Sequence, residues 1–451
     1  MAADVFRITL AQLNPTVGDI AGNAAKAREA RAKAAADGAD VVVLPELFIA
    51  GYPPGELLRE PDFQAACRAA VEALARETAD GGPAVLIGTP WAEDGKLYDA
   101  VALLDAGRIS ATRFKTNLPD DDAFEHKHLF ARGPAAGPLS VRGRRIGVAI
   151  GEDLGAEEVA GYENVVETLA ETGAEFIVVP SGSRHARGHG DRRLSLAVAR
   201  VIESGLPLVY LNLIGGQNER VFDGASFALN ADVSLAAQLP AFAEQITTLA
   251  IERDDDGWHS GPVASLPEGD EADYMARVLG LRDRVAKSRF DGIVLGLTAD
   301  IESALSLAMA VDALGPAGVR GVVLSGPDTQ AQDEVIAAAA RLGVVAEVVP
   351  IAAAVAGFES ILAAKLSHSA HRDLLAGVRA TLLKALASLS GALALLPQQE
   401  SSRRGDDIEP AQLIRLAALR NRWRPVDALG AAGEVIPPDL IDRAASGAVQ
   451  G

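Results

Sequence analysis

Residues 41–54 read VVVLPELFIAGYPP, an apolar run that ends at a proline and is followed directly by the carboxylate of Glu46. A short valine-rich run bounded by proline predicts a buried β-strand. A carboxylate at the carboxyl end of such a strand lies where sites form in open α/β sheets. Since an isolated glutamate in this position is more often a solvated turn residue, Glu46 indicates chemistry only if other residues join it.

The alternation of strands and helices around this segment predicts a layered α/β domain. Short apolar runs separated by longer stretches of helical periodicity are typical of this class. We expect strands at 6–10, 41–44, 84–88, 145–150, 176–179 and 208–212, helices at 23–36 and 61–78, and a hairpin over 98–105 and 108–114.

A second α/β domain is predicted after a polar, turn-rich break. Residues 253–270 begin with RDDDG and contain further Gly and Pro turns, so we interpret them as a linker between domains at 1–252 and 271–451. In the second domain, helices at 274–288, 301–314 and 328–342 alternate with strands at 292–297, 321–324 and 346–350. This order predicts a doubly wound parallel sheet, and a further helix is expected at 410–421.

Length, charge and cysteine content exclude several classes of protein. With 42 basic and 61 acidic residues among 451, the net charge is −19, which disfavours non-specific binding to nucleic acid or to anionic membranes. Residues 1–10 lack the apolar core of a signal peptide, and no apolar stretch is long enough to span a bilayer. Cys67 is the single cysteine, so neither an intramolecular disulfide nor a cysteine-based metal cluster can form. We therefore expect a cytoplasmic protein without a metal site.

Two further stretches join Glu46 as candidates for a site in the first domain. Lys115 lies in FKTNLP at 114–119, and the strand expected at 145–150 runs into Gly151, Glu152 and Asp153. Each stretch alone is weak, because a lone lysine is usually a surface residue. Together with LIGGQNERVFDGAS at 213–226, they resemble the nitrilase superfamily, and most closely the glutaminase domain of the glutamine-dependent NAD⁺ synthetase family. The resemblance spans roughly residues 5–250.

This resemblance implies roles for three positions and draws attention to a missing group. Glu46 would be the general base and Lys115 the stabiliser of the oxyanion, while the family's nucleophilic cysteine falls at Gly151. Glycine has no side chain, so no thioester can form there. The family's LPNY is LPDD at 118–121, and its FDE is FEH at 124–126. Cys67 lies within an expected helix, and we interpret it as a small core residue.

The second domain shows a similar change at its expected phosphate site. Residues 291–304 read DGIVLGLTADIESA, a strand, a turn and a helix that alone give only a weak signal for phosphate binding. In context they resemble the PP-loop, SGGxDS, of the synthetase domain of the same family. The degenerate loop consists of Thr298, Ala299, Asp300, Glu302 and Ser303. Asp300 is expected to place a negative charge where phosphate would bind, and its repulsion would weaken the affinity for ATP.

Two neighbouring loops depart from the family pattern as well. The loop at 325–330, SGPDTQ, lacks the family's arginine, and the stretch at 396–402, LPQQESS, lacks a lysine and a carboxylate that would hold phosphates and metal. The resemblance therefore implies a nitrilase-like α-β-β-α sandwich followed by a PP-loop (adenine nucleotide α-hydrolase-like) domain in which both chemical sites are altered.

Two functions follow from the resemblance. The first is an inactive paralogue that serves as a structural or regulatory subunit, as a homo- or hetero-oligomer, possibly with an active NAD⁺ synthetase. The alternative is an active ligase that converts ATP, deamido-NAD⁺ and glutamine to NAD⁺. A relic that binds only a nucleotide is a third hypothesis. We expect no cofactor under the first function, and ATP with Mg²⁺ only if the family activity is retained.

Overall fold

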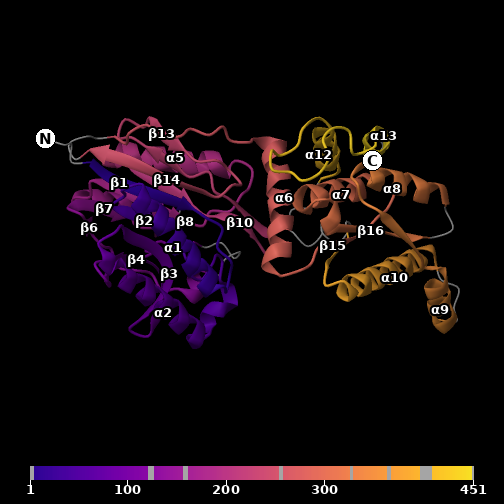
Figure 1. The fold of residues 1–451 in the computed structure, drawn as a ribbon, viewed down its shortest axis with the longest axis horizontal. Coiled ribbons are helices and arrows are strands. Elements are labelled where there is room, and N and C mark those ends of the chain that lie inside the picture. The colour runs from indigo at the N-terminus through magenta and orange to yellow at the C-terminus, as the bar shows by residue number, and fades with distance from the viewer. Residues whose placement is uncertain are drawn as a thin grey trace. The chain divides into compact units, whose positions relative to one another are not determined.

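A computed structural model describes residues 5–119, 126–155, 161–252, 257–325, 329–362, 367–396 and 409–448. The chain divides into two compact units, Met1–Pro267 and Glu268–Gly451, each with its own sheets and helices (Figure 1). Each unit is described separately below. No described helix is both long and apolar enough to cross a membrane.

The first unit contains two six-stranded sheets. One has the order β14-β1-β2-β3-β4-β5, and the other has the order β13-β12-β9-β8-β7-β6. The strands of the first sheet are β1 (Val5–Gln12), β2 (Val41–Val43), β3 (Ala84–Glu93), β4 (Lys96–Asp105), β5 (Arg108–Phe114) and β14 (Gln245–Glu252). Those of the second are β6 (Leu139–Val141), β7 (Arg144–Val148), β8 (Phe176–Ser181), β9 (Leu208–Asn212), β12 (Phe227–Leu229) and β13 (Leu235–Gln238).

Helices cover the outer face of each sheet. Apolar residues of α1 (Ile20–Ala36) and α2 (Pro61–Glu77) pack on the first sheet, and those of α4 (Val165–Glu171) and α5 (His189–Ser204) pack on the second. A separate apolar cluster fills the space between the sheets, where the rings of Phe6 and Phe176 lie 5.7 Å apart. This layering confirms the α-β-β-α sandwich. Smaller elements are α3 (His126–Leu129) and the hairpin of β10 (Ile214–Gln217) and β11 (Arg220–Asp223).

The second unit is built on a four-stranded parallel sheet. Its order is β17-β16-β15-β18, with bounds Ala346–Pro350, Val319–Ser325, Ile293–Gly296 and Leu393–Leu395. The helices are α6 (Gly269–Lys287), α7 (Ile301–Leu314), α8 (Thr329–Arg341), α9 (Ala352–Leu362), α10 (His368–Leu389), α12 (Pro410–Arg422) and α13 (Pro438–Ala448). One apolar cluster packs α7 and α8 against the sheet, and another packs α10 against it. Two helical layers around parallel strands confirm the doubly wound fold.

The segment expected to be a linker is partly ordered against the first unit. Trp258 is buried, and its ring meets that of Phe176 edge to face at 5.1 Å. A bridge to Ile251 also ties Trp258 to β14. Helix α6 begins at Gly269, so the end of the expected linker is helical. Residues 253–256 lie outside the described part of the chain.

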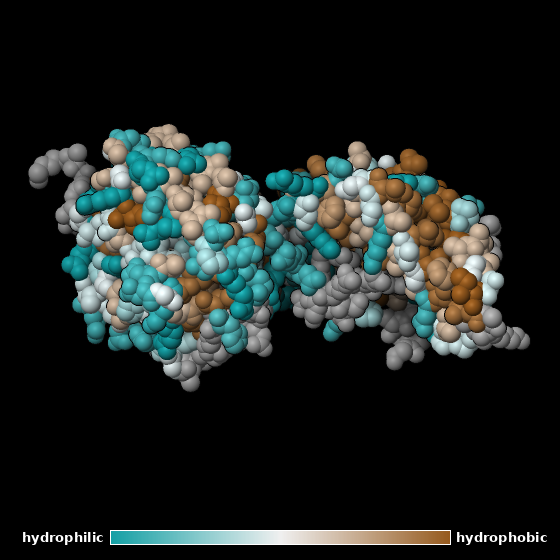
Figure 2. Space-filling view, turned by 90° about the horizontal axis from the view of Figure 1, so that it is seen from below, coloured by the Kyte–Doolittle hydropathy of each residue, from teal (hydrophilic) through white to brown (hydrophobic). Residues whose placement is uncertain are grey.

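Apolar side chains are exposed at the edge of the second unit's sheet. Among the described strands, β17 pairs only with β16, and Val348 on β17 is exposed. On α9, Phe358 and Ile361 are also exposed, the latter by 79%. Figure 2 shows apolar residues gathered on the surface of this unit. Proteins usually cover such an edge, because it offers both unpaired backbone groups and apolar area to another chain.

Candidate active-site regions

Three positions far apart in the sequence meet at one end of the first unit's sheets. Glu46 follows β2, Lys115 follows β5, and Gly151 begins a short 3₁₀ turn after β7. Lys115 Nζ lies 2.5 Å from Glu46 Oε1. A Cβ atom added to Gly151 would lie 2.9 Å from Glu46 Oε2 and 3.0 Å from Lys115 Nζ. The side chain of residue 151 would therefore point directly at both groups, but glycine supplies none.

Burial and hydrogen bonding fix these two side chains. Lys115 is fully buried, and Glu46 is 1% exposed. Glu46 Oε2 accepts a hydrogen bond of 2.8 Å from the backbone N–H of Gly182, just beyond β8. The carboxylate is thus held between a lysine and a backbone donor, and both of these contacts hold it in one orientation.

Two more carboxyl groups lie close to Lys115: Glu152, which the sequence placed in a candidate stretch without a role, and Asp99, which no sequence pattern identified. Glu152 Oε2 contacts Lys115 Nζ directly, and Asp99 Oδ2 lies 3.9 Å from it. Burial alone would lower the pKa of Lys115, but Glu152, Glu46 and Asp99 outweigh it and hold that pKa well above its ordinary value. Burial, followed by the charge of Glu46, raises the pKa of Asp99 well above its usual range. Asp99 could have been noticed from the sequence, because it is the one charged residue within the otherwise apolar strand sequence YDAVALL at 98–104.

Asp153 ties the turn after β7 to the segment that carries Lys115. Its carboxylate accepts hydrogen bonds from the backbone N–H groups of Asn117 at 2.7 Å, Thr116 at 3.1 Å and Ile150 at 3.1 Å. Even so, burial raises the pKa of Asp153 to about 7, because three backbone donors compensate for only part of the lost hydration.

This pKa predicts how stability depends on pH. The folded state keeps the Asp153 proton up to about pH 7, whereas the unfolded state loses it near pH 4, so this group makes stability fall as the pH rises between those values. Asp153→Asn removes this titration. Between pH 4 and pH 7, the free energy of unfolding of the variant should therefore decrease by up to about 4 kcal/mol less than that of the wild type. Urea unfolding from pH 4.5 to 7.5 measures it. Exposed Asp62→Asn is the matched control, and equal pH slopes for Asp153→Asn and the wild type would contradict the prediction.

In the second unit, Asp300 caps the helix that follows the predicted phosphate loop. Its Oδ1 accepts a hydrogen bond of 2.8 Å from the backbone N–H of Ser303, in the first turn of α7. Its Oδ2 accepts one of 2.6 Å from the Thr298 hydroxyl, and Ser303 Oγ accepts one of 3.0 Å from the Thr298 backbone N–H. A backbone donor available to an anion at a helix N-terminus is therefore occupied by the chain's own carboxylate.

A cavity of about 590 Å³ opens at the carboxyl ends of β15 and β16, beside α10. Gly296, Leu297 and Thr298 line it on one side, and Arg372 and Arg379 line it from α10. The Nε of Arg379 is buried and has no hydrogen-bond partner among the described residues. These two arginines could hold an anionic group. The sequence reasoning missed them, although their spacing of seven places both on one helix face.

Several expected site residues lie outside the described part of the chain. They are 120–125 in the first unit, and 326–328 and 397–402 in the second. Within the described ranges, no group of three or more His, Cys, Asp or Glu residues is placed to hold a metal ion. Cys67 is buried in the cluster between α2 and the first sheet, and burial raises the pKa of its thiol to about 12. This confirms its interpretation as a core residue, since the reactive form is the thiolate.

Each of the two units matches a family of known proteins. The carbon-nitrogen hydrolase family model covers residues 7–256, and the NAD synthase model covers residues 274–401. A glutamine-dependent NAD⁺ synthetase from Rhodobacter capsulatus is 39% identical over 464 residues, which is 98% of this chain and 83% of the relative. The chain belongs to the glutamine-dependent NAD⁺ synthetase family.

Solved structures agree with this family assignment. The glutamine-dependent NAD⁺ synthetase from Acinetobacter baumannii, solved with ADP, superposes with a TM-score of 0.87 at 28% identity, covering 97% of this chain and 85% of that one. The first unit alone resembles an amidase of the nitrilase superfamily from Nesterenkonia, solved as a cysteine-to-alanine mutant. That likeness has a TM-score of 0.50 at 25% identity and covers 56% of this chain and 93% of the amidase.

The charged side chains of the two candidate regions make different contacts. In the first unit, the buried side chains of Glu46 and Lys115 and the half-exposed side chain of Glu152 form a charged cluster beside Gly151. In the second, Asp300 and Ser303 close the loop onto α7. Gly151 has a φ of +52°, a left-handed conformation that favours glycine, so any side chain placed there adds backbone strain to the crowding at its Cβ.

Proposed function

We propose that this chain does not hydrolyse glutamine through a covalent thiol intermediate, and that it acts in NAD⁺ biosynthesis as a structural or regulatory subunit beside an active synthetase. The observation that carries the proposal is the position of Gly151 between Glu46 and Lys115. The two groups that the family resemblance implies as base and oxyanion stabiliser lie together there, but the atom that would attack the amide carbon is absent. Cys67 cannot replace it, because it is buried in a different cluster.

The altered loop of the second unit supports the same proposal. Asp300 brings a negative charge to the start of α7 and occupies a backbone donor there. Both changes disfavour the phosphates of ATP, so we propose that the subunit role needs neither ATP nor Mg²⁺. The exposed apolar side chains of β17 and α9 support an oligomer, with a second copy or with a related synthetase chain.

An active glutamine-dependent NAD⁺ synthetase is the second candidate, and the family comparisons favour it. Several relatives carry that name, and the match to the Rhodobacter capsulatus protein extends over 98% of this chain. The cavity beside α10, with Arg372 and Arg379, offers positive charge for an anionic substrate. Under this candidate, the chain converts ATP, deamido-NAD⁺ and glutamine to NAD⁺.

Two measurements, NAD⁺ formation and assembly mass, separate the two candidates. NAD⁺ formation from ATP and deamido-NAD⁺ is measured with either glutamine or ammonium as the nitrogen donor. The proposed subunit forms no NAD⁺ with either donor, and its mixture with an active synthetase of the family shows a combined assembly mass. Formation with glutamine supports the second candidate. Formation with ammonium alone would keep the inference about Gly151 but exclude a purely structural second unit.

The charge of Asp300 predicts weak ATP binding that a neutral side chain should improve. Asp300→Asn keeps the acceptor for the Ser303 N–H but removes the charge, so we expect affinity to rise about tenfold or more. Calorimetry with ATP and Mg²⁺ measures the change. Asp291→Asn, at the opposite end of β15, is the matched control and should have no effect. Weaker binding by Asp300→Asn would mean that this carboxylate recruits the metal ion.

A further inference from the structure

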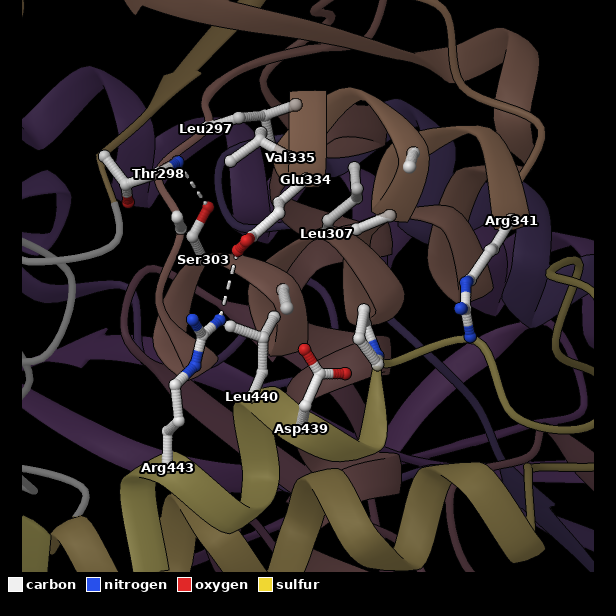
Figure 3. Close-up of a pocket in the computed structure, with 15 residues that line it drawn as sticks. Leu297, Thr298, Ser303, Leu307, Glu334, Val335, Arg341, Asp439, Leu440 and Arg443 are labelled. Carbon is white, nitrogen blue, oxygen red and sulfur yellow. Dashed lines mark hydrogen bonds and ion pairs between the residues drawn. The ribbon is translucent and has the colours of Figure 1, made fainter. Parts of the chain in front are cut away.

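A second cavity in the C-terminal unit lies on the opposite side of the 297–299 segment from α10. It measures about 160 Å³, is partly open to solvent and lies between α7, α8 and α13 (Figure 3). We call it the three-helix pocket. Its apolar wall includes Leu307, Val335 and Leu440, one from each helix. Leu297 and Pro437 also line it, and the remaining apolar residues are small, namely Ala299, Ala304, Ala337 and Ala338.

Charged side chains surround this pocket unevenly. Arg443 pairs with Glu334 at 3.3 Å on one side, as the dashed line in Figure 3 shows. Arg341 lies on the other side and forms no ion pair with any residue in the described ranges. Asp439 is in the first turn of α13, where the helix dipole favours a carboxylate. With Arg443 and Glu334 paired, Arg341 and Asp439 are the two charged groups of the lining without an ion pair among the described residues, and Arg341 is the cation of the two.

We propose that the three-helix pocket binds a small carboxylate with an apolar ring, the ring against Leu307, Val335 and Leu440 and the carboxylate on Arg341. The volume suits this class, because an engineered apolar cavity of about 150 Å³ binds benzene in another protein. Pockets with mostly apolar walls and a few polar groups at one end are typical of small-molecule sites. A guanidinium is also the side chain best suited to hold a carboxylate through two parallel hydrogen bonds.

Residues of the altered phosphate loop form part of the wall of the three-helix pocket. Thr298 and Ser303, which are joined by a hydrogen bond of 3.0 Å, both line it. Leu297 and Thr298 also line the larger cavity beside α10. A ligand in the three-helix pocket therefore packs against residues that shape the larger cavity. The proposal is independent of the subunit role, since it requires no catalytic activity from either unit.

Benzoate is the probe that tests the proposal on the full chain. Ligand-observed NMR titration should detect binding to the wild type, and Arg341→Gln should weaken it about tenfold by removing a charged hydrogen-bond donor. Ala337→Leu should abolish binding by filling the pocket from an exposed position that tolerates leucine. Arg422→Gln, at an exposed arginine of α12 that lines neither cavity, is the matched control and should bind benzoate as the wild type does. Thermal unfolding verifies that each variant is folded.

Three results would overturn the proposal. One is the absence of benzoate binding to the folded wild type at millimolar concentration. Another is a loss of binding in Arg372→Gln but not in Arg341→Gln, which would place benzoate in the cavity beside α10. The third is tighter binding of benzylamine than of benzoate, which would show that Glu334 or Asp439 sets the charge preference. None of these results bears on the glutaminase or synthetase assays.

Discussion

Purified protein is expected to release no ammonia from glutamine above the rate of a protein-free control. Removing the nucleophile from a catalytic group that acts as a unit costs several orders of magnitude in rate, and Gly151 supplies no attacking atom. The measurement is ammonia release at saturating glutamine, compared with an active synthetase of the same family. Turnover that disappears in Glu46→Ala would show instead that this site works without a side chain at residue 151.

Gly151→Cys by itself is not expected to restore activity. The new Cβ would lie 2.9 Å from Glu46 Oε2 and 3.0 Å from Lys115 Nζ, which is closer than Cβ atoms normally approach other atoms. Both side chains would have to shift, while Glu152 still holds Lys115 from the other side. Ammonia release by Gly151→Cys at a rate comparable to the active relative would mean that the pocket adapts easily and that only the thiol is missing.

Lys115→Met should destabilise the protein by about 3–5 kcal/mol, the range observed when one partner of a buried ion pair is removed. Lys115 is fully buried, and it is the cation that Glu46, Glu152 and Asp99 share. Without it, Glu46 remains buried with an uncompensated charge. Urea unfolding at pH 7 measures the change in the free energy of unfolding.

Two comparisons show whether the effect comes from the buried charges. Lys26→Met removes an exposed ion pair with Glu244 and should change stability by at most about 1 kcal/mol. The double variant Lys115→Met with Glu46→Gln should recover part of the loss, because it also removes the unpaired carboxylate. If the double variant loses as much free energy of unfolding as the two single variants lose together, the loss would instead come from packing.

Much of the fold could be predicted because local patterns and burial agree along the chain. The expected helix at 301–314 and strand at 346–350 have the bounds of α7 and β17 in the structure. Other boundaries moved by a few residues: the strand expected at 84–88 extends to Glu93, because it pairs along its length with β4. Such extensions depend on a partner strand, so local periodicity does not define them.

The candidate sites could be predicted only in part. Glu46, Lys115 and Gly151 were identified through a family resemblance, and the structure brings the three positions together. Asp99 was missed and Glu152 was given no role, because a lone acidic residue in a strand or turn carries no specific pattern. Their effect on Lys115 arises from proximity: Lys115 and Asp99 are fully buried and Glu152 is half-exposed, so hydration screens their charges only in part.

The sequence by itself determined the two α/β units, the absence of a side chain at residue 151 and the negative charge at Asp300, since each is a property of residue identity or spacing. Only the tertiary structure decided which groups meet. It places Glu46 and Lys115, 69 residues apart, in contact, turns Asp300 into a helix cap and opens the three-helix pocket. The physical reason is that contacts between distant segments depend on how sheets and helices pack, and local periodicity carries no information about that packing.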